Sequence, residues 1–219
     1  MYSGYKDSQC LICFQDLRQS ISLFHLIHHP PICLTCLQSF DVLDRTFSFD
    51  GYSLTILYHY NDFFKKLLFQ YKGLYDYALK DAFLQSFLSE LKVKYKHHII
   101  AVVPSNENKK RDFYPNEEIV KTFHSSIFKG LYKNKLYKQT DQKDRSFIKD
   151  VIQIKDGNRL TNQKVLLFDD VITSGYTIRS CIKQIEKYHP KSIEILVLAT
   201  NQFSTLFTSS TKYVSKKEI

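Results

Sequence analysis

The chain has 219 residues, of which 43% are hydrophobic, so it is long enough for one α/β domain and a small additional module. The low numbers of Gly (6) and Pro (5) argue against a fibrous or disordered chain, and no apolar run approaches the roughly 20 residues of a membrane span. The N-terminus lacks the basic start and apolar block of a signal peptide, so we expect a cytoplasmic protein.

The net charge of +9 is unevenly distributed. Residues 1–60 carry three basic and five acidic groups, a balance of −2, so the remainder of the chain carries +11. Such an excess favours a polyanionic partner, either nucleic acid or a phosphorylated small molecule. A solvated, lysine-rich surface is the equally simple alternative.

Four cysteines punctuate the N-terminal segment as two Cys-x2-Cys pairs separated by 19 residues. Each pair places two thiolates on one side of a tight turn, and two such turns complete a tetrahedral metal site. Because four protein ligands leave no open position, we predict a structural Zn²⁺ site that supplies folding energy to a segment too small for its own core. The expected ligands are Cys10, Cys13, Cys33 and Cys36.

Two weaker interpretations of these cysteines stay open, a redox-active pair and four unrelated buried thiols. The nearby histidines His25, His28 and His29 are expected in loops or on the surface, since the four cysteines are sufficient without them. Cys181, in a predicted helix, is expected to be a small core residue.

Further along the chain, residues 51–60 are rich in β-forming side chains and predict a strand. A helical pattern follows, and Asn61 is a suitable N-cap for it. Apolar residues at helical spacing predict a second helix over 77–92.

After this helix the pattern becomes that of an α/β sheet. Short apolar runs at 98–104, 165–169 and 192–200 predict strands buried on both faces. Helices are expected over 117–128 and 175–188, with two short strands between them. This alternation predicts an α/β fold with a mainly parallel sheet and helices on both faces.

Residues 165–177 (VLLFDDVITSGYT) combine a buried strand, two acids and a small polar turn before a helix. Asp169 and Asp170 come at the carboxyl end of the strand, the edge where open α/β sheets bind ligands. The turn offers hydroxyls, a glycine that lets backbone N–H groups approach a phosphate, and the positive end of a helix dipole. These turn residues are Thr173, Ser174, Gly175 and Thr177.

The two carboxylates would repel a phosphate unless they bind something else. Ribose hydroxyls, or a metal ion held between carboxylate and ligand, are the natural candidates. Helix capping is the alternative explanation, but a cap needs one polar residue and five crowd into this turn. We therefore predict a phosphate-binding loop.

Residues 165–177 resemble the motif of type I phosphoribosyltransferases that binds 5-phosphoribosyl diphosphate (PRPP): two acids, two apolar residues, then Thr-Ser-Gly-x-Thr. The resemblance implies a type I phosphoribosyltransferase-like sheet in which Asp169 and Asp170 contact the ribose hydroxyls. It also implies Mg²⁺, chelated mainly by PRPP itself. The resemblance assigns the 5-phosphate to Thr173, Ser174, Gly175 and Thr177.

A four-cysteine module followed by such a domain resembles the layout of the ComF family, the ComFC competence proteins and their GntX-like relatives. The segment YHYNDFFKKLLFQYK and the Val-Val-Pro strand also fit. The resemblance divides the chain into a zinc module (1–47), a phosphoribosyltransferase-like domain (48–201) and a polar tail (202–219).

One stretch departs from the family pattern. Where the family carries Arg-Gly-Phe-Asn-Gln, residues 113–117 read FYPNE, so that only Asn116 is kept. Positive charge for the diphosphate is expected from Lys109, Lys110 and Arg111.

The resemblance implies a cytoplasmic protein, which could also lie peripherally at the inner face of the membrane. It would handle incoming single-stranded DNA in natural transformation, beside a helicase-like partner. An active phosphoribosyltransferase of nucleotide salvage and a PRPP-sensing regulator are the alternatives, and the sequence leaves transferase activity undecided. Besides the basic run at 109–111, Lys65 and Lys66 are candidate DNA contacts by charge clustering alone.

Overall fold

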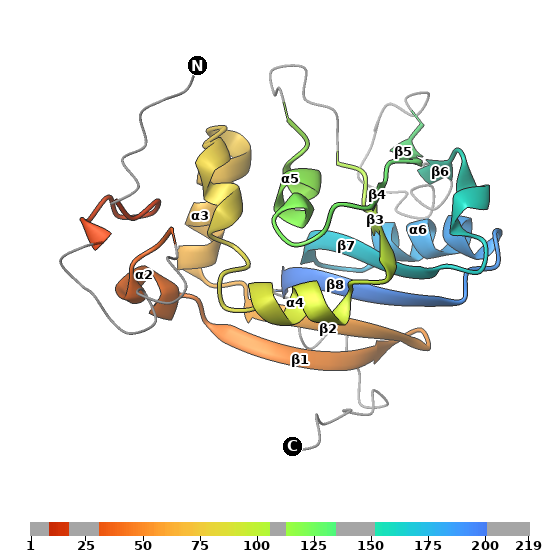
Figure 1. The fold of residues 1–219 in the computed structure, drawn as a ribbon, viewed down its shortest axis with the longest axis horizontal. Helices are drawn as coiled ribbons and strands as arrows, with labels where there is room; N and C mark the ends of the chain where they lie inside the picture. The colour runs from red at the N-terminus through yellow and green to blue at the C-terminus, as the bar shows by residue number, and fades with distance from the viewer. Residues whose placement is uncertain (1–8, 18–30, 106–112, 135–151, 201–219) are drawn as a thin grey trace.

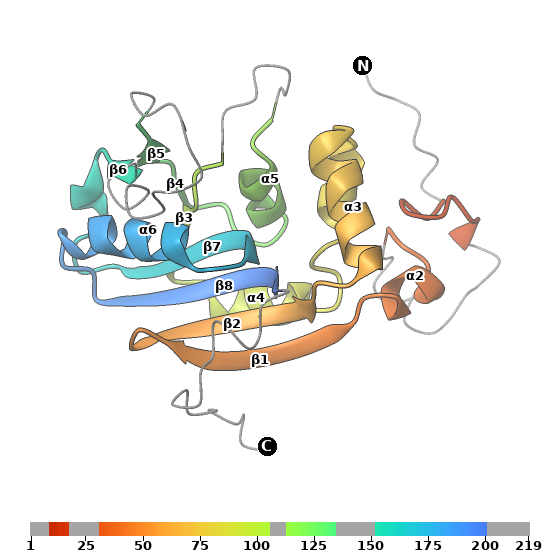
Figure 2. The same ribbon diagram turned by 180° about the vertical axis from the view of Figure 1, so that it is seen from behind.

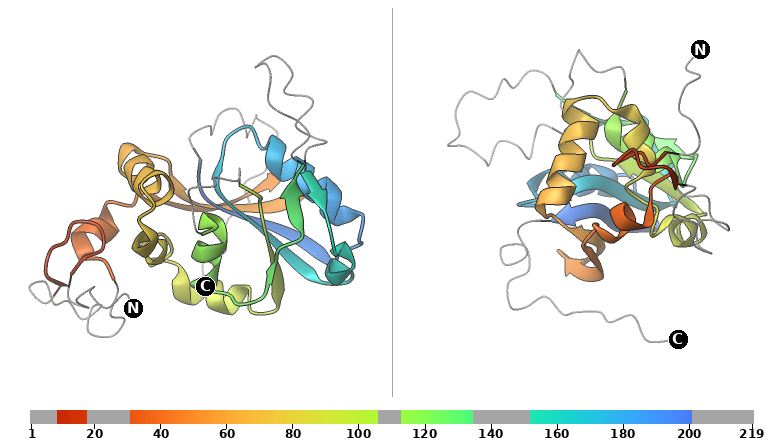
Figure 3. Two further views of the ribbon diagram at one scale, coloured as in Figure 1. Left: turned by 90° about the horizontal axis from the view of Figure 1, so that it is seen from above. Right: turned by 90° about the vertical axis from the view of Figure 1, so that its left-hand side faces the viewer.

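The computed structural model describes residues 9–17, 31–105, 113–134 and 152–200. Within them, one six-stranded sheet is covered by helices, and the cysteine-bearing segment lies at one end, beyond α3 (Asp62–Gly73) (Figure 1; Figure 3). None of the described helices is long and apolar enough to cross a membrane.

The sheet has the strand order β1-β2-β8-β7-β3-β4. All neighbours pair in parallel except β1 and β2, which form an antiparallel hairpin. Two further strands, β5 and β6, pair antiparallel in a separate ribbon. The strands are β1 (Val42–Phe49), β2 (Tyr52–His59), β3 (His98–Val102), β4 (Ile127–Phe128), β5 (Leu131–Lys133), β6 (Ile152–Ile154), β7 (Lys164–Ile172) and β8 (Ser192–Thr200).

Helices cover both faces of the sheet, which confirms the predicted fold class. The face that carries α4 is turned toward the viewer in Figure 1, and the face that carries α6 in Figure 2. The remaining helices are α2 (Leu34–Gln38), α4 (Leu88–Lys94), α5 (Pro115–Lys121), α6 (Tyr176–Glu186) and the short 3-10 helices at Tyr77–Asp81 and Gly157–Leu160.

Each face of the sheet has its own apolar core. Leu166 and Phe168 of β7 pack with residues of α3, α4 and α5, whereas Val165 and Leu167 pack with residues of α6. Successive side chains of a strand point to opposite faces, and the alternation of β7 follows this rule. The alternation holds as far as Phe168. The next two residues, Asp169 and Asp170, both lie within reach of one side chain, Asn116 of α5.

Several predicted elements are confirmed, among them the strands on β3, β7 and β8 and the helix capped by Asn61. The Asn61 side chain accepts a hydrogen bond from the N–H of Phe64 at 2.8 Å. The helix predicted over 77–92 is wrong. It is broken into a 3-10 turn at Tyr77–Asp81 and α4. The three consecutive residues Ala82, Phe83 and Leu84 are all buried, and they would span about 200° around a regular helix, more than one face covers.

One other prediction needs correction, and one strand was not predicted. The helix predicted over 117–128 begins at Pro115 and ends at Lys121, since Ile127 is used by β4 to pair with β3. The strand β1 was not predicted, although its Asp50-Gly51 turn, with both φ angles positive, is a strong hairpin signal. The proposed boundary between residues 47 and 48 falls within β1.

Candidate metal centre and ligand site

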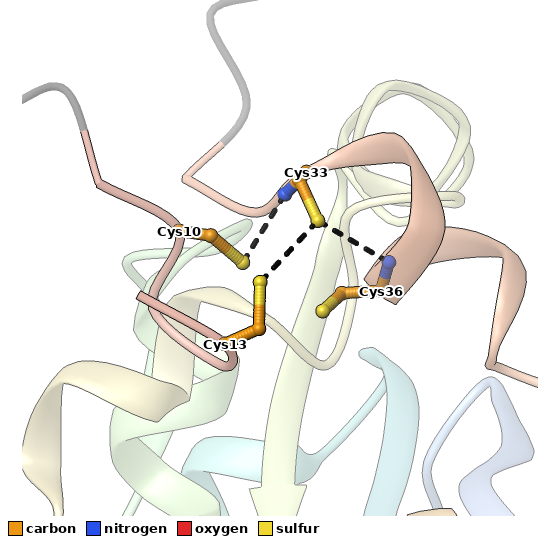
Figure 4. A group of neighbouring side chains, drawn as sticks. All are labelled: Cys10, Cys13, Cys33 and Cys36. Carbon is orange, nitrogen blue, oxygen red and sulfur yellow. Dashed lines mark hydrogen bonds between the residues drawn. The ribbon is translucent and has the colours of Figure 1, made fainter. Parts of the chain in front are cut away.

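The four cysteines of the two Cys-x2-Cys pairs converge (Figure 4). Their sulfur atoms all lie within 4.8 Å of one another, and those of Cys13 and Cys33 are 3.6 Å apart. All four are free thiols. A tetrahedral zinc site, with metal–sulfur bonds of about 2.3 Å, has sulfur–sulfur edges of about 3.8 Å. The arrangement therefore fits a structural Cys₄ site, and the four residues could hold a metal ion.

Backbone N–H groups donate hydrogen bonds to two of these sulfur atoms. The Cys10 sulfur accepts from the N–H of Cys33 at 3.3 Å, and the Cys33 sulfur accepts from the N–H of Cys36 at 3.4 Å. Burial opposes ionisation of Cys10, but N–H groups from Cys13, Cys33 and Ile12 outweigh it and lower its pKa to about 7. Burial raises the pKa of Cys36. Four thiolates at this spacing require a bound cation, since each would otherwise repel the others.

The cysteine segment is attached to the domain by aromatic packing. Phe40, just after α2, lies 5.2 Å from Phe63 and 6.3 Å from Phe64, ring centroid to ring centroid. Cys10 and Cys33 belong to the same buried cluster as these rings. The metal site would therefore support the amino end of α3.

The two adjacent acids lie within β7, where the sheet becomes narrower. The N–H of Val103 donates to the Phe168 carbonyl at 2.9 Å, and the β3 ladder ends there. On the other side of β7, β8 continues to pair as far as Ile172. Asp169 and Asp170 therefore lie at a step in the sheet, where β7 has lost its neighbour β3 but still pairs with β8. The two acids were predicted at the carboxyl end of the strand, and β7 continues two residues beyond them to Ile172.

Side chains from two helices meet the acids at this step. Asn116 of α5 donates through Nδ2 to Asp169 Oδ1 at 3.0 Å and lies 3.4 Å from Asp170 Oδ1. Lys72 of α3 pairs with Asp170 Oδ2 at 2.6 Å. The hydroxyl of Tyr71 donates to the Pro115 carbonyl at 2.7 Å, so the residues next to Lys72 and Asn116 are themselves joined.

The surroundings drive the pKa values of the two acids apart. Burial and the neighbouring Asp170 raise the pKa of Asp169 well above its ordinary value. Burial also opposes ionisation of Asp170, but the ion pair with Lys72 holds its pKa below the ordinary value. Asp170 is thus the acid of the pair that ionises first, and Asp169 holds its proton to a higher pH. Such a pair can accept hydrogen bonds from a diol or share a cation.

The turn between β7 and α6 gathers the predicted phosphate-loop residues. Thr173 and Ser174 are exposed, and Thr177 lies in the first turn of α6. Gly175 is the N-cap at φ +72°, in the left-handed region that glycine adopts without strain. The hydroxyls of the turn and the amino end of α6 thus lie together, immediately after the acid pair.

The β1–β2 hairpin packs against this turn. Arg179 donates through Nη1 to the Ser174 carbonyl at 2.8 Å and through Nε to Asp50 Oδ2 at 2.6 Å. Its guanidinium carbon lies 4.4 Å from the centroid of the Phe49 ring. A Cβ at position 175 would lie 2.5 Å from Phe49 Cζ. Glycine is therefore required at this position both by its φ angle and by the close approach of the hairpin.

The residues predicted for the diphosphate, Lys109, Lys110 and Arg111, lie outside the described residues. Sequence reasoning gave no role to Lys72 or Arg179, and both contact the site. Lys72 belongs to the segment that carries the family resemblance, but nothing local indicates that it pairs with Asp170. Asn116 was noted only as a remnant of a family motif, and the structure places it against both acids.

Comparison with known proteins gives two kinds of similarity. Residues 115–219 match the phosphoribosyl transferase domain family. The chain is 29% identical over 159 residues to the competence protein ComFC of Streptococcus pneumoniae, and the match covers 68% of each chain.

The solved structures that the chain is similar to include a hypoxanthine phosphoribosyltransferase from Staphylococcus aureus, with 20% identity, a TM-score of 0.39 and coverage of 61% of this chain and 69% of that one. A purine phosphoribosyltransferase from Pyrococcus horikoshii gives 22% identity and a TM-score of 0.39, covering 55% and 73% of the two chains. The fold class rests on the order and direction of the strands in the sheet.

The cysteine cluster predicts the behaviour of a Cys33→Ser variant. Because the Cys33 sulfur lies next to that of Cys13 and accepts from the N–H of Cys36, its loss should abolish stoichiometric zinc binding and lower the melting temperature. Elemental analysis of the purified protein measures the zinc. Cys181→Ser, at a buried thiol of α6, is the matched control and should keep its zinc. Undiminished zinc in Cys33→Ser would refute the metal site.

The acid pair predicts opposite stability effects for two similar variants. An acid with a raised pKa contributes stability below its ordinary pKa and loses it as pH rises through the folded value. Asp169→Asn should therefore raise the free energy of unfolding at about pH 8 by on the order of 1 kcal/mol, and by less at about pH 5.

Asp170→Asn provides the contrast, because it leaves Lys72 without its carboxylate partner and should give no gain at either pH. Urea denaturation at both pH values measures the difference. Equal changes in the two variants would contradict the unequal charge states described above.

Proposed function

Since the comparisons support assignment to the ComF family with a phosphoribosyltransferase-like domain, we propose that this chain is a competence-type DNA-uptake protein. It binds PRPP or a related ribose 5-phosphate and handles single-stranded DNA during natural transformation. The observation that carries the proposal is one sheet edge at which an acid pair adjoins a Thr-Ser-Gly-x-Thr turn and the start of a helix.

The proposed ligand matches the chemistry of this edge. A 5-phosphate accepts hydrogen bonds from hydroxyls and from backbone N–H groups at a helix start. The hydrogen bond from Arg179 to the Ser174 carbonyl holds the turn in one conformation before the ligand binds. The ribose diol donates to the carboxylates, and Mg²⁺ enters with PRPP. The proposed contacts are Asp169 and Asp170 for ribose, Thr173, Ser174, Gly175 and Thr177 for the 5-phosphate, and Lys109, Lys110 and Arg111 for the diphosphate.

The remaining parts of the chain have supporting roles. The Cys₄ module binds structural zinc and stabilises the amino end of α3. We keep the division into a module, a phosphoribosyltransferase-like domain (to residue 201) and a polar tail (202–219). The first boundary would lie before Val42, where β1 begins. The proposed location is the cytoplasm, peripherally at the inner face of the membrane, beside a helicase-like partner.

A phosphoribosyltransferase of nucleotide salvage is the second candidate, favoured by the domain family that residues 115–219 match. Incubation with isotope-labelled PRPP and free bases separates the two, because only a transferase forms a labelled nucleotide. We expect binding without transfer. Transfer to a base would replace the DNA-uptake proposal with the salvage enzyme. A PRPP-sensing regulator, the third candidate, would instead bind PRPP while its zinc module contacts DNA or a protein.

The ribose assignment predicts that Asp170→Asn weakens PRPP binding by roughly 10- to 100-fold, the usual cost of losing a hydrogen bond to a charged group. Asp169→Asn should weaken it by roughly 2- to 10-fold, the usual cost of losing a hydrogen bond to a neutral group. Isothermal titration calorimetry with Mg²⁺ and PRPP measures the affinity. Asp81→Asn, at an acid that pairs with Lys80, is the control and should bind normally. Unchanged affinity in both site variants, with circular dichroism confirming the fold, would show that PRPP does not bind at these acids.

A further inference from the structure

The helix α3 has one buried and one exposed side. Phe64, Leu67, Leu68 and Tyr71 are buried against the sheet. Lys65, Lys66 and Phe69 are exposed and lie within about one turn of one another on the opposite side. A large aromatic ring thus stands on the surface beside two cations.

Phe69 is 63% exposed, although phenylalanine is among the residues most often buried. A Cβ at position 73 would lie 2.9 Å from Phe69 Cε2, so the ring lies along the bare backbone of Gly73, which adds no side chain to cover it. Its environment keeps one face of this ring accessible at the carboxyl end of the helix.

The exposed surface continues into the turn after α3. Leu74 is 63% exposed, and Tyr75 is 37% exposed with a backbone φ of +63°. The left-handed region is unfavourable for an aromatic residue, and such strain persists where the surrounding structure imposes it, often at functional sites. We define the α3 ridge as Lys65, Lys66, Phe69, Leu74 and Tyr75.

The ridge is close to the proposed ligand site. Lys72, on the same helix, reaches inward to Asp170 at 2.6 Å. Lys72 follows Phe69 by three positions, so the carboxyl end of the ridge lies about one helical turn from the residue that pairs with Asp170. A polymer lying on the ridge would extend toward that residue.

The composition of the ridge fits one kind of polymer. Aromatic rings stack on unpaired bases whatever their sequence, and lysines beside them neutralise the phosphates between those bases. A duplex hides its base faces, so exposed rings favour single strands. The net charge of +9 favours a polyanion over a neutral protein partner.

We propose that the α3 ridge is the surface on which single-stranded DNA binds, with bases stacked on Phe69 and phosphates at Lys65 and Lys66. This inference rests on the proposed function and adds to it the face of the protein that contacts the DNA. It also places the strand beside the acid pair, so that DNA and the ribose-phosphate ligand occupy neighbouring sites.

The test is fluorescence anisotropy with a labelled oligothymidylate, titrated over a series of salt concentrations. Phe69→Ala should weaken binding by roughly 5- to 150-fold, the range for one stacked base, and Phe69→Tyr should retain it. Lys65→Ala/Lys66→Ala should reduce the slope of log K against log salt by about 1.4, since each phosphate contact on a single strand contributes about 0.7.

Matched controls come from α4, which also presents exposed lysines and an exposed apolar residue. Lys92→Ala/Lys94→Ala removes two exposed cations from another surface, and Val93→Ala shortens an exposed apolar side chain there. Both should leave affinity and slope unchanged. Because the ridge side chains are exposed, thermal unfolding and PRPP binding should be unaffected in the ridge variants.

The possible results distinguish whether the chain binds single-stranded DNA at all from whether it binds on the α3 ridge. If the wild-type chain binds no oligothymidylate even at low salt, the DNA part of the proposed function fails, and the ridge with it. If the wild type binds but the ridge variants keep its affinity and slope, or lose no more than the α4 controls, the ridge assignment alone is overturned.

Discussion

Two adjacent, partly buried carboxylates at a step in the sheet are the constraint on which the arrangement of this molecule depends. A second charge at that position is costly, so the site needs a cation and a hydrogen-bond donor from outside the strand. Lys72 at the end of α3 and Asn116 at the start of α5 supply them. The hydrogen bond from Tyr71 to the Pro115 carbonyl ties these helices together beside the acids, so the packing of both helices is linked to the charge state of the site.

The other side of the site is fixed by the β1–β2 hairpin rather than by a helix. Arg179 connects Asp50 to the carbonyl of Ser174, and Phe49 packs where a side chain at position 175 would stand. A turn held in this way loses little conformational entropy when a phosphate binds. The hairpin, an antiparallel addition to a parallel sheet, therefore fixes one side of the candidate ligand site.

Sequence reasoning succeeded where the relevant residues are contiguous. The strand, acid pair, turn and helix of residues 165–177 could be predicted because each part is adjacent to the next, and the cysteine pairs could be predicted from their spacing alone. It failed where partners are distant, as for Arg179 and Asp50, which lie 129 residues apart. It also failed between Leu79 and Phe87, where tertiary burial on several sides overrode helical periodicity.

The central claim is that the acid pair and the loop form one site for a ribose 5-phosphate. A crystal structure of the chain with Mg²⁺ and PRPP tests it most directly. We expect the 5-phosphate at the backbone N–H groups and hydroxyls of residues 173–177, with the ribose hydroxyls on Asp169 and Asp170. PRPP bound elsewhere, or an empty loop at saturating ligand, would contradict it.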